Sequence, residues 1–374
     1  MKRVCLDFWV TPSPLAHRLF EAVGEWWRNC LMGILLLLLL TACEHRELTD
    51  ITNEHYVRIY LNEHLRNVTY GFYDETKEKP KYKSPQTVRV TLSDPTTGKV
   101  VSQRYLHDSG TDERGYYLHG YIQAAPGEYD LLAYNFDTEA THINHEASYP
   151  DMEVYTNVID ESLSSRLESV RTGEVTRYGD IRYEPDHVFV CSERNVRVAS
   201  VVEGRDTLQT STGSHPLAES VTKTYYMQVN VKGVEYVRSA VALITGMSGS
   251  VRMHDRSLVP EMESSIYFNL QNGLNKSRTG EEKMAVAYAS FNTFGKLPDV
   301  EGYIEITFEF NTIYGTTQTE TIRVTDMFET EQVREQQWII IDKVIEIVPP
   351  EGVSTGGMTP GVNQWEEIKG DITI

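Results

Sequence analysis

The stretch Ile304-Glu305-Ile306-Thr307-Phe308-Glu309-Phe310 alternates strictly between apolar and polar side chains. Because successive side chains of a β-strand point to opposite faces, this pattern places the apolar residues on one face and the acids on the other. It predicts a half-buried strand of an antiparallel sheet, with solvated carboxylates on its outer face. These seven residues therefore indicate a β-protein.

Runs of the same kind extend on both sides of this stretch. They are rich in Val, Ile and Tyr and are separated by Asp-Pro, Thr-Gly and Pro-Gly turn signals. The predicted strands are 56–61, 87–92, 99–106, 116–122, 128–136, 186–191, 195–201, 222–231, 239–244, 264–270, 284–291, 303–310, 317–324 and 337–348. The helical spacing of Ile159, Leu163 and Leu167 predicts one short surface helix. Together these elements favour an all-β antiparallel sandwich architecture.

A polar stretch, 203–220, contains glycine and proline and has no alternation that could hold a strand register. We expect a domain boundary there, because the chain is long enough for two cores. The Gly- and Pro-rich tail either packs as an edge strand or leaves the body. The predicted organisation is a first sandwich at 55–205, a linker at 206–220, a second sandwich at 221–348 and a tail at 349–374.

The N-terminal region has the pattern of a bacterial lipoprotein signal. An apolar run that begins at Leu31 ends in Leu40-Thr41-Ala42-Cys43. In such a signal the cysteine thiol is diacylated and becomes the new N-terminus. We expect residues 1–42 to be a signal peptide, Cys43 to carry covalent lipid and 43–54 to form a tether. A transmembrane helix fits less well, because a membrane span needs about 20 apolar residues.

The net charge limits the partners of the exported part. The whole chain carries −19, and removal of four Lys/Arg and three Asp/Glu with residues 1–42 leaves −20. Such a surplus repels nucleic-acid phosphates and anionic lipid headgroups. We therefore expect no nucleic-acid partner, and membrane attachment through the lipid alone.

Cysteine usage argues against an internal disulfide. Cys5 and Cys30 lie in the predicted signal peptide and Cys43 is the acylation site, so Cys191 remains as a single thiol. It follows an apolar run, 188–190, which predicts a small core residue rather than a nucleophile.

The search for catalytic or metal-binding motifs is negative. His142 and His145 lie in a loop-like stretch without a further ligand pattern, so we expect no metal site. The sequence Gly246-Met247-Ser248-Gly249 lacks the G-x-S-x-G spacing and predicts a tight turn. Glu281-Glu282, Glu305 and Glu309 raise the question of a glycosidase pair, but the last two lie on the polar face of one strand and are expected to be solvated, so we expect no such pair. We expect no catalytic residue, no enzyme activity and no cofactor other than the lipid.

Tyrosine is abundant, at 22 of 374 residues. Exposed tyrosines stack on sugar rings and anchor protein interfaces, so Tyr116, Tyr117, Tyr121 and Tyr134 are candidates for a glycan-binding surface. Tyrosine also has high β propensity, and sheet packing is the simpler explanation.

Several stretches resemble lipoproteins of the fimbrillin superfamily from Bacteroidales. In the first half these are Leu40 to Leu48 and Ala125-Pro126-Gly127-Glu128-Tyr129-Asp130-Leu131-Leu132-Ala133-Tyr134-Asn135. In the second half, the stretches that are similar to FimB-type fimbrial anchor lipoproteins are 225–233, 240–250, 321–326 and the tail Gly356-Gly357-Met358-Thr359-Pro360-Gly361-Val362-Asn363-Gln364-Trp365. Each stretch is a turn or strand pattern, and none is a catalytic signature.

The resemblance implies two tandem transthyretin-like β-sandwich domains on a lipid anchor, at the outer membrane and facing the cell surface. It implies an anchor or accessory subunit of a fimbria or pilus, with other fimbrial subunits as partners and strand addition as the mode of assembly. A plain Lys- or Arg-bounded propeptide, typical of stalk subunits, is absent from the sequence, which favours the anchor and leaves a tip or accessory role open. The alternative function is a surface lipoprotein that binds glycan or another ligand through its tyrosines.

Overall fold

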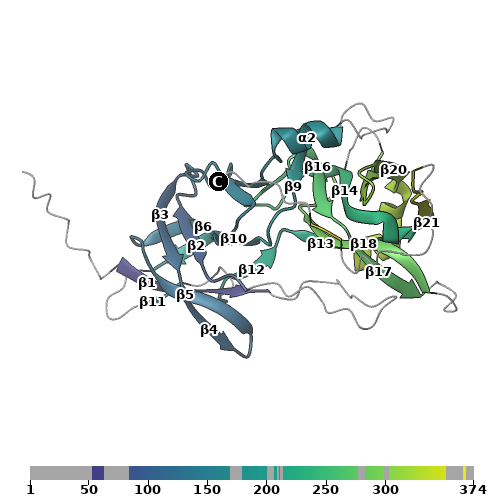
Figure 1. Cartoon of the computed structure of the whole chain (residues 1–374). Helices are drawn as coiled ribbons and strands as arrows, with labels where there is room; N and C mark the ends of the chain where they lie inside the picture. Colours follow the sequence, from purple (N-terminus) through teal and green to yellow (C-terminus); the bar gives the residue numbers. More distant parts are fainter. Residues whose placement is uncertain are drawn as a thin grey trace, which may run out of the picture. The chain divides into compact units, whose positions relative to one another are not determined.

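The structure, a computed structural model, is built mainly of β-strands (Figure 1). The residues that it describes are 53–62, 84–168, 179–199, 206–208, 210, 214–276, 283–298, 303–350 and 365–367. The lipoprotein signal with Cys43, the tether up to residue 52, Glu281-Glu282 and most of the tail lie outside the described residues. The all-β prediction is confirmed.

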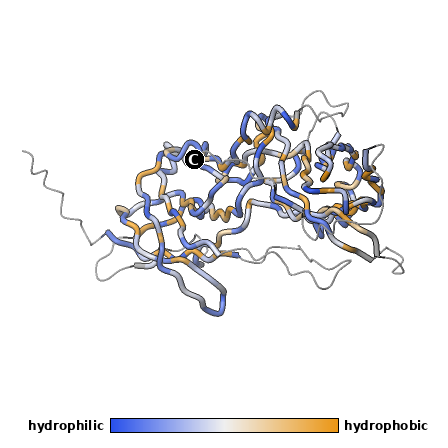
Figure 2. The backbone as a smooth tube through the Cα atoms, in the orientation of Figure 1, coloured by the Kyte–Doolittle hydropathy of each residue, from blue (hydrophilic) through white to orange (hydrophobic). Residues whose placement is uncertain are grey.

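The first body is one nine-stranded sheet in the order β3-β2-β6-β10-β12-β1-β5-β4, with β11 beside β1. Alternating apolar side chains from both halves of this order form a single core, so the sheet folds over itself to enclose them. Short apolar and polar segments alternate along its strands in Figure 2. The strands are β1 (Glu54–Leu61), β2 (Val88–Ser93), β3 (Val100–Leu106), β4 (Asp108–Asp112), β5 (Gly115–Gln123), β6 (Gly127–Asn135), β10 (Phe189–Val198), β11 (Asp206–Thr207) and β12 (Leu217–Ser220).

The predicted linker at 206–220 contains two of these strands, so the expectation that it lacks strand register is wrong. Strand β12 pairs antiparallel with β10 and parallel with β1, where Tyr60 N–H donates to Pro216 O at 3.0 Å. It joins the two halves of the nine-stranded sheet. A strand of four residues is too short to show a clear alternation of side chains. Its partners lie far away in the sequence, so the local pattern could not predict it.

The second body is a sandwich of two sheets, ordered β17-β18-β13-β21 and β20-β19-β14-β16-β9. A large apolar core lies between them and includes the stacked pair Phe268 and Phe291, whose ring centroids are 4.0 Å apart. The strands are β9 (Asp180–Tyr183), β13 (Lys223–Lys232), β14 (Val237–Ser248), β16 (Glu263–Asn269), β17 (Gln271–Lys276), β18 (Lys283–Thr293), β19 (Glu305–Thr312), β20 (Thr317–Arg323) and β21 (Trp338–Glu346).

Short helices lie at the ends of these strands. Helix α3 is capped by Thr330, whose side chain accepts a hydrogen bond from Val333 N–H, and it ends at Gln337 in the left-handed region. The helical elements are α2 (Glu161–Glu168), α3 (Glu331–Gln336) and the 3-10 turns η2 (Val234–Tyr236), η3 (Pro260–Met262) and η4 (Thr325–Glu329). No helix in the described part of the chain has the length and apolar character needed to cross a membrane.

The two bodies exchange elements. Strand β9, from the first half of the sequence, extends the second body by pairing with β16. In the other direction β15 (Ser250–Arg252) joins β8 (Glu153–Thr156) and β7 (Thr141–Asn144) in a three-stranded sheet that covers the outer side of β6 and β10. Strand membership therefore does not follow the sequence boundaries that we expected, and Thr52–Ile374 forms one compact unit.

Helix α2, predicted from its apolar spacing, is confirmed, but it is not a free surface helix. Leu163 and Leu167 are buried against β9, β14 and β16 of the second body. The same helix contributes Arg166, which pairs with the carboxylate of Glu309 at 3.3 Å. Its packing ties the first half of the chain to the outer face of the second sandwich.

The opening stretch is a strand, β19, but its polar face is not solvated. Glu309 is only 2% exposed, and Glu305 and Thr307 are also buried. Glu309 also accepts a hydrogen bond from Asn311 Nδ2 at 3.0 Å. The prediction of a half-buried strand with solvated acids is therefore wrong, because partners from other parts of the chain cover the second face.

Candidate functional site

The predicted lipidation site, Cys43, and its preceding residues Leu40, Thr41 and Ala42 lie outside the described residues. Their role stays a prediction. The described part of the chain has three surfaces with accessible edges, aromatic rings or a concave shape.

The four candidate tyrosines do not form one surface. Tyr117 and Tyr121 lie on the outer face of β5, whereas Tyr116 packs against the core and donates its hydroxyl to Pro85 O at 3.1 Å. Tyr134 is fully buried under the three-stranded sheet, where desolvation raises the pKa of its hydroxyl. Alternation along each strand decided this division, because side chains an odd number of residues apart face opposite ways.

Strand β1 adds residues that our sequence reasoning missed. Tyr56 lies 5.5 Å from Tyr121 between ring centroids, Tyr60 lies 5.3 Å from Tyr117, and the Arg58 guanidinium lies 4.2 Å from the Tyr117 ring centroid. We refer to these five side chains as the β1–β5 aromatic face. The alternation Tyr56-x-Arg58-x-Tyr60 is the sequence signal that could have placed these three side chains on one face of the strand. Tyr121 is 38% exposed and the others less, so the face is shallow and partly covered.

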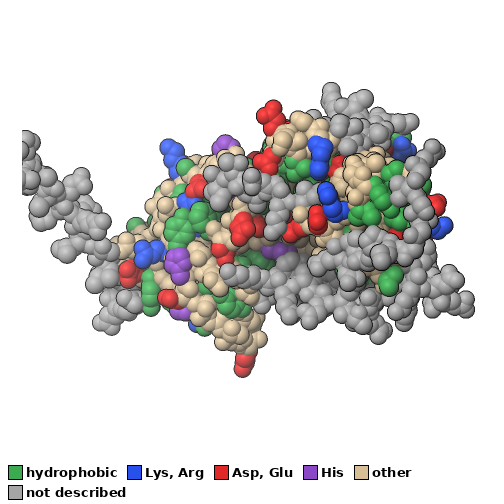
Figure 3. Space-filling model, viewed as in Figure 1, with side chains coloured by type: hydrophobic (Ala, Val, Ile, Leu, Met, Phe, Trp, Pro, Cys, Tyr) green, Lys and Arg blue, Asp and Glu red, His purple; other side chains and the backbone are tan. Residues whose placement is uncertain are grey.

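An acid holds part of this face in place. The Tyr60 hydroxyl donates to Asp112 Oδ2 at 2.6 Å, and Arg58 Nη1 donates to the same oxygen at 3.1 Å. The hydrogen bond from Tyr60 lowers the pKa of Asp112, while burial raises the pKa of the Tyr60 hydroxyl. Hydrophobic side chains also gather beside histidine on the viewed face of the first body (Figure 3).

A second candidate is a groove between β20 and β21, the edge strands of the two sheets of the second body. It has a volume of about 310 Å³, and Phe310, Ile345 and Ile347 of its lining are buried in the core. At one end the Gln318 side chain donates to Val348 O at 2.9 Å and accepts from Val348 N–H at 3.2 Å. One side-chain amide thus makes both hydrogen bonds that a neighbouring strand would make.

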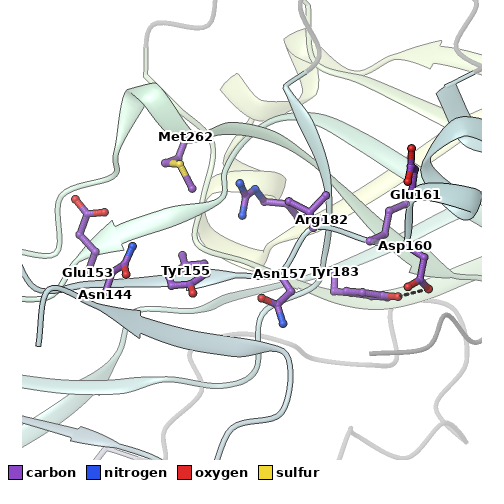
Figure 4. A pocket seen from close by; sticks show the side chains of 11 residues that line it. Asn144, Glu153, Tyr155, Asn157, Asp160, Glu161, Arg182, Tyr183 and Met262 are labelled. Carbon is purple, nitrogen blue, oxygen red and sulfur yellow. Dashed lines mark hydrogen bonds between the residues drawn. The ribbon is translucent and has the colours of Figure 1, made fainter. Parts of the chain in front are cut away.

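A third candidate is a cleft of about 650 Å³ beside the three-stranded sheet. Its walls come from segments distant in sequence: β7, the segment from β8 to the start of α2, β9 and η3 (Figure 4). Arg182 is fixed there by hydrogen bonds from Nη1 to Thr156 O at 2.6 Å and from Nη2 to Asp180 at 3.0 Å. The lining residues are Asn144, Glu153, Tyr155, Asn157, Val158, Ile159, Asp160, Glu161, Arg182, Tyr183 and Met262.

The remaining motifs have structural roles. Cys191 is buried in β10, and burial raises the pKa of its thiol to about 12, so the prediction of a core residue is confirmed. His142 lies on β7 rather than in a loop, and its Nε2 is 2.7 Å from Asn157 Nδ2. No group of three or more metal-ligating side chains occurs among the residues that the structure describes.

The predicted turn near Gly246 lies partly within a strand. Strand β14 continues to Ser248 with a bulge between Ile244 and Met247, and the bend before β15 falls at Gly249. A Cβ atom at Gly249 would lie 2.5 Å from Ser264 Oγ and 2.8 Å from Arg182 Nε. Glycine is therefore required for close packing against Arg182 rather than for a nucleophile elbow.

These features define a class of all-β protein with two linked sheet bodies and accessible sheet edges. The chain belongs to the family described as "Domain of unknown function (DUF5119)", whose model matches residues 42–269. It is similar to the "Putative fimbrium anchoring subunit Fim4B" of Bacteroides ovatus, with 26% identity over 253 residues. That match covers 67% of this chain and 63% of the relative, less than two thirds of the relative's length.

A solved structure shows the same fold. A crystal structure of a "putative adhesin" from Bacteroides ovatus is 23% identical with a TM-score of 0.51, and the likeness covers 83% of this chain and 98% of that one. The fimbrial anchor protein Mfa2 from Porphyromonas gingivalis is 14% identical, with a TM-score of 0.41, and the likeness covers 78% of this chain and 90% of that one. The resemblance to Bacteroidales fimbrial anchor proteins is confirmed.

Proposed function

We propose that this protein is a lipid-anchored structural subunit of a fimbria, in an anchor or accessory role. The name of the Bacteroides ovatus relative, a fimbrium anchoring subunit, supports this role, as does the lipoprotein signal that ends at Cys43. We infer that the acylated cysteine holds the protein in the outer membrane, facing the cell surface. Other fimbrial subunits are its proposed partners, and no enzymatic step or further cofactor is part of the role.

We also propose that the two bodies are transthyretin-like sandwiches that accept a strand from a partner subunit. The observation that carries this proposal is the groove between the edge strands β20 and β21. Within the described sheets β20 pairs only with β19, and β21 only with β13. An unpaired edge presents backbone N–H and C=O groups to any extended chain that reaches it.

The edge of β21 has the backbone geometry that strand addition needs. Ile347 N–H donates to Lys232 O on β13 at 2.9 Å. Because backbone groups alternate between the two sides of a strand, the N–H groups of Glu346 and Val348 point away from β13. Val344 and Val348 are exposed there, at 38% and 55%, and would contact side chains of an added strand. In the free protein the side-chain amide of Gln318 makes the outward hydrogen bonds of the Val348 backbone.

The test compares two substitutions at one exposed position. Glu346→Pro removes the outward N–H and places a ring at the edge, while the ladder to β13 keeps its hydrogen bonds. Glu346→Gln changes the side-chain charge and keeps the N–H. After purification of the acylated protein from the outer membrane of its native host, we expect a partner subunit to co-purify with the wild type and Glu346→Gln, but not with Glu346→Pro.

Thermal unfolding of both variants is measured in parallel. Loss of the partner counts as evidence only for a variant that is shown to be folded. Co-purification that is equal in Glu346→Pro and Glu346→Gln would reject this edge as the acceptor. Recovery of the wild type as a lone monomer would reject the fimbrial role itself.

The lipid anchor is tested separately. Cys43→Ala removes the thiol that accepts the acyl chains, so we expect no fatty-acid labelling and either an uncleaved precursor or release from the membrane. Cys30→Ala lies in the predicted signal peptide and should label as the wild type does. Labelling and membrane retention in Cys43→Ala after signal cleavage would exclude the lipoprotein assignment.

A further inference from the structure

We propose that the cleft beside the three-stranded sheet binds a neutral sugar unit of a glycan. This site is distinct from the β1–β5 aromatic face and does not depend on the fimbrial role. Its volume of about 650 Å³ falls in the range of small-ligand sites. Figure 4 shows side chains from four segments of the chain around this space.

The charge of the cleft argues for a neutral ligand. Its lining includes the carboxylates of Glu153, Asp160 and Glu161 and one cation, Arg182. The two terminal nitrogens of that cation already donate to Thr156 O and to Asp180. Phosphate, sulfate or uronate groups would therefore meet an excess of negative charge. Hydroxyl groups, by contrast, donate to carboxylates and accept from amides and guanidinium groups.

A donor without a partner lies within the wall of this cleft. Arg182 is 7% exposed, and its Nε has no hydrogen-bond partner in the described part of the chain. In Figure 4 its guanidinium group is turned toward the side of the cleft where Met262 and Tyr155 lie. Nε itself is covered, with Gly249 packed close to it, so a ligand would meet the other parts of the Arg182 side chain that line the cleft.

Aromatic rings provide the apolar part of the site. Tyr155 and Tyr183 are both partly exposed, and their rings are positioned by contacts with His142 at 5.8 Å and Tyr267 at 6.4 Å between centroids. Tyrosine pairs an apolar ring, suited to the C–H face of a sugar, with a hydroxyl that hydrogen-bonds. The Tyr183 hydroxyl donates to Asp160 Oδ2 at 3.3 Å, which orients that carboxylate.

The site is held rigidly before any ligand arrives. Asn157 is bonded through its side chain to His142 at 2.7 Å and through its backbone O to Tyr183 N–H at 2.9 Å. Strands β7, β8 and β9 carry five of the other lining residues, so little conformational entropy is lost there on binding. Convergent polar groups, two rings and a concave rigid frame together match a carbohydrate site.

The test uses saturation-transfer NMR on the detergent-solubilised acylated protein. The probes are methyl glycosides of glucose, galactose, mannose and N-acetylglucosamine, with inorganic phosphate and spermidine as charged competitors. We expect at least one glycoside to bind, with affinity reduced at least about tenfold by Tyr155→Ala and by Val158→Trp. Val158 is 47% exposed at the cleft rim, so the tryptophan fills the cleft without entering the core.

Tyr105→Ala is the matched control, since Tyr105 is 39% exposed on the first body and should leave binding unchanged. Absence of binding for all four glycosides, or displacement by phosphate or spermidine at lower concentration, would overturn the proposal. Loss of binding in Tyr121→Ala but not in Val158→Trp would assign the sugar to the β1–β5 aromatic face and equally overturn it. Sugar binding should persist in Glu346→Pro, which separates this result from that of the fimbrial test.

Discussion

Substitution of Leu167 tests how strongly the first half of the chain holds the second sandwich. Leu167 is 1% exposed and packs in one cluster with Leu163, Val241 and Tyr267. Helix α2 has eight residues, too few for stability on its own, so its burial against the sandwich must stabilise it. Leu167→Ala should therefore destabilise the whole unit rather than the helix alone.

The magnitude follows from the carbon atoms removed. Leu→Ala deletes three carbons at about 0.8 kcal/mol each, or about 2.4 kcal/mol of transfer free energy. A cavity adds to this loss, and measured core Leu→Ala substitutions cost about 2.7–5.0 kcal/mol. A short helix can move inward and partly fill the space, so we expect a decrease of about 2.5–3.5 kcal/mol in the free energy of unfolding.

The assay is urea unfolding followed by tryptophan fluorescence and circular dichroism. Ser165→Ala, at an exposed position of the same helix, is the control and should change the free energy of unfolding by less than about 0.5 kcal/mol. We expect a single cooperative transition for both variants. A cost below about 1 kcal/mol for Leu167→Ala would refute the conclusion that α2 is a core element.

Three further predictions concern buried groups. Asn292 N–H donates to Glu184 Oε2 at 3.0 Å, and burial raises the pKa of Glu184 to about 7. Because its pKa is higher in the folded than in the unfolded chain, the wild type loses stability as pH rises from about 4.5 to about 7. Glu184→Gln should match the wild type near pH 4.5 and exceed it by about 3 kcal/mol above pH 7 in urea titrations; a constant difference would contradict this origin. Gly249→Ala should lower the free energy of unfolding by about 1–3 kcal/mol, because its Cβ would contact the Arg182 side chain at 2.7–2.8 Å; an unchanged midpoint would show that the site has room. Cys191 should stay unmodified by iodoacetamide in the native protein, since burial raises its pKa to about 12, and should react in urea, as mapped by mass spectrometry; rapid native alkylation would show that β10 is accessible.

The candidate sites were only partly visible in the sequence. Tyr117 and Tyr121 were identified together with Tyr116 and Tyr134, although alternation separates the four between two faces and two strands. The cleft was not predicted at all. Its residues come from segments as far apart as Asn144 and Met262, and nothing in their local pattern indicates that they meet.

The strands themselves were predictable because alternation is a local property. Each long strand, such as β13 or β19, carries enough period-two residues for its position to be read within a few residues. The bulge in β10 interrupts that period, and the sequence there suggested two strands instead of one. The helical spacing in α2 and the core location of Cys191 were local signals of the same kind.

Sequence alone thus determined the all-β class, most strand positions, the predicted acylation site and the family resemblance. Only the tertiary structure decided which strands pair: β12 joins the two halves of the first sheet, β9 extends the second sandwich, and α2 covers the polar side of β19. The physical reason is that side-chain alternation specifies which face of a strand is apolar. The partner that covers the other face, and so buries Glu309, is chosen by contacts with residues far away in the chain.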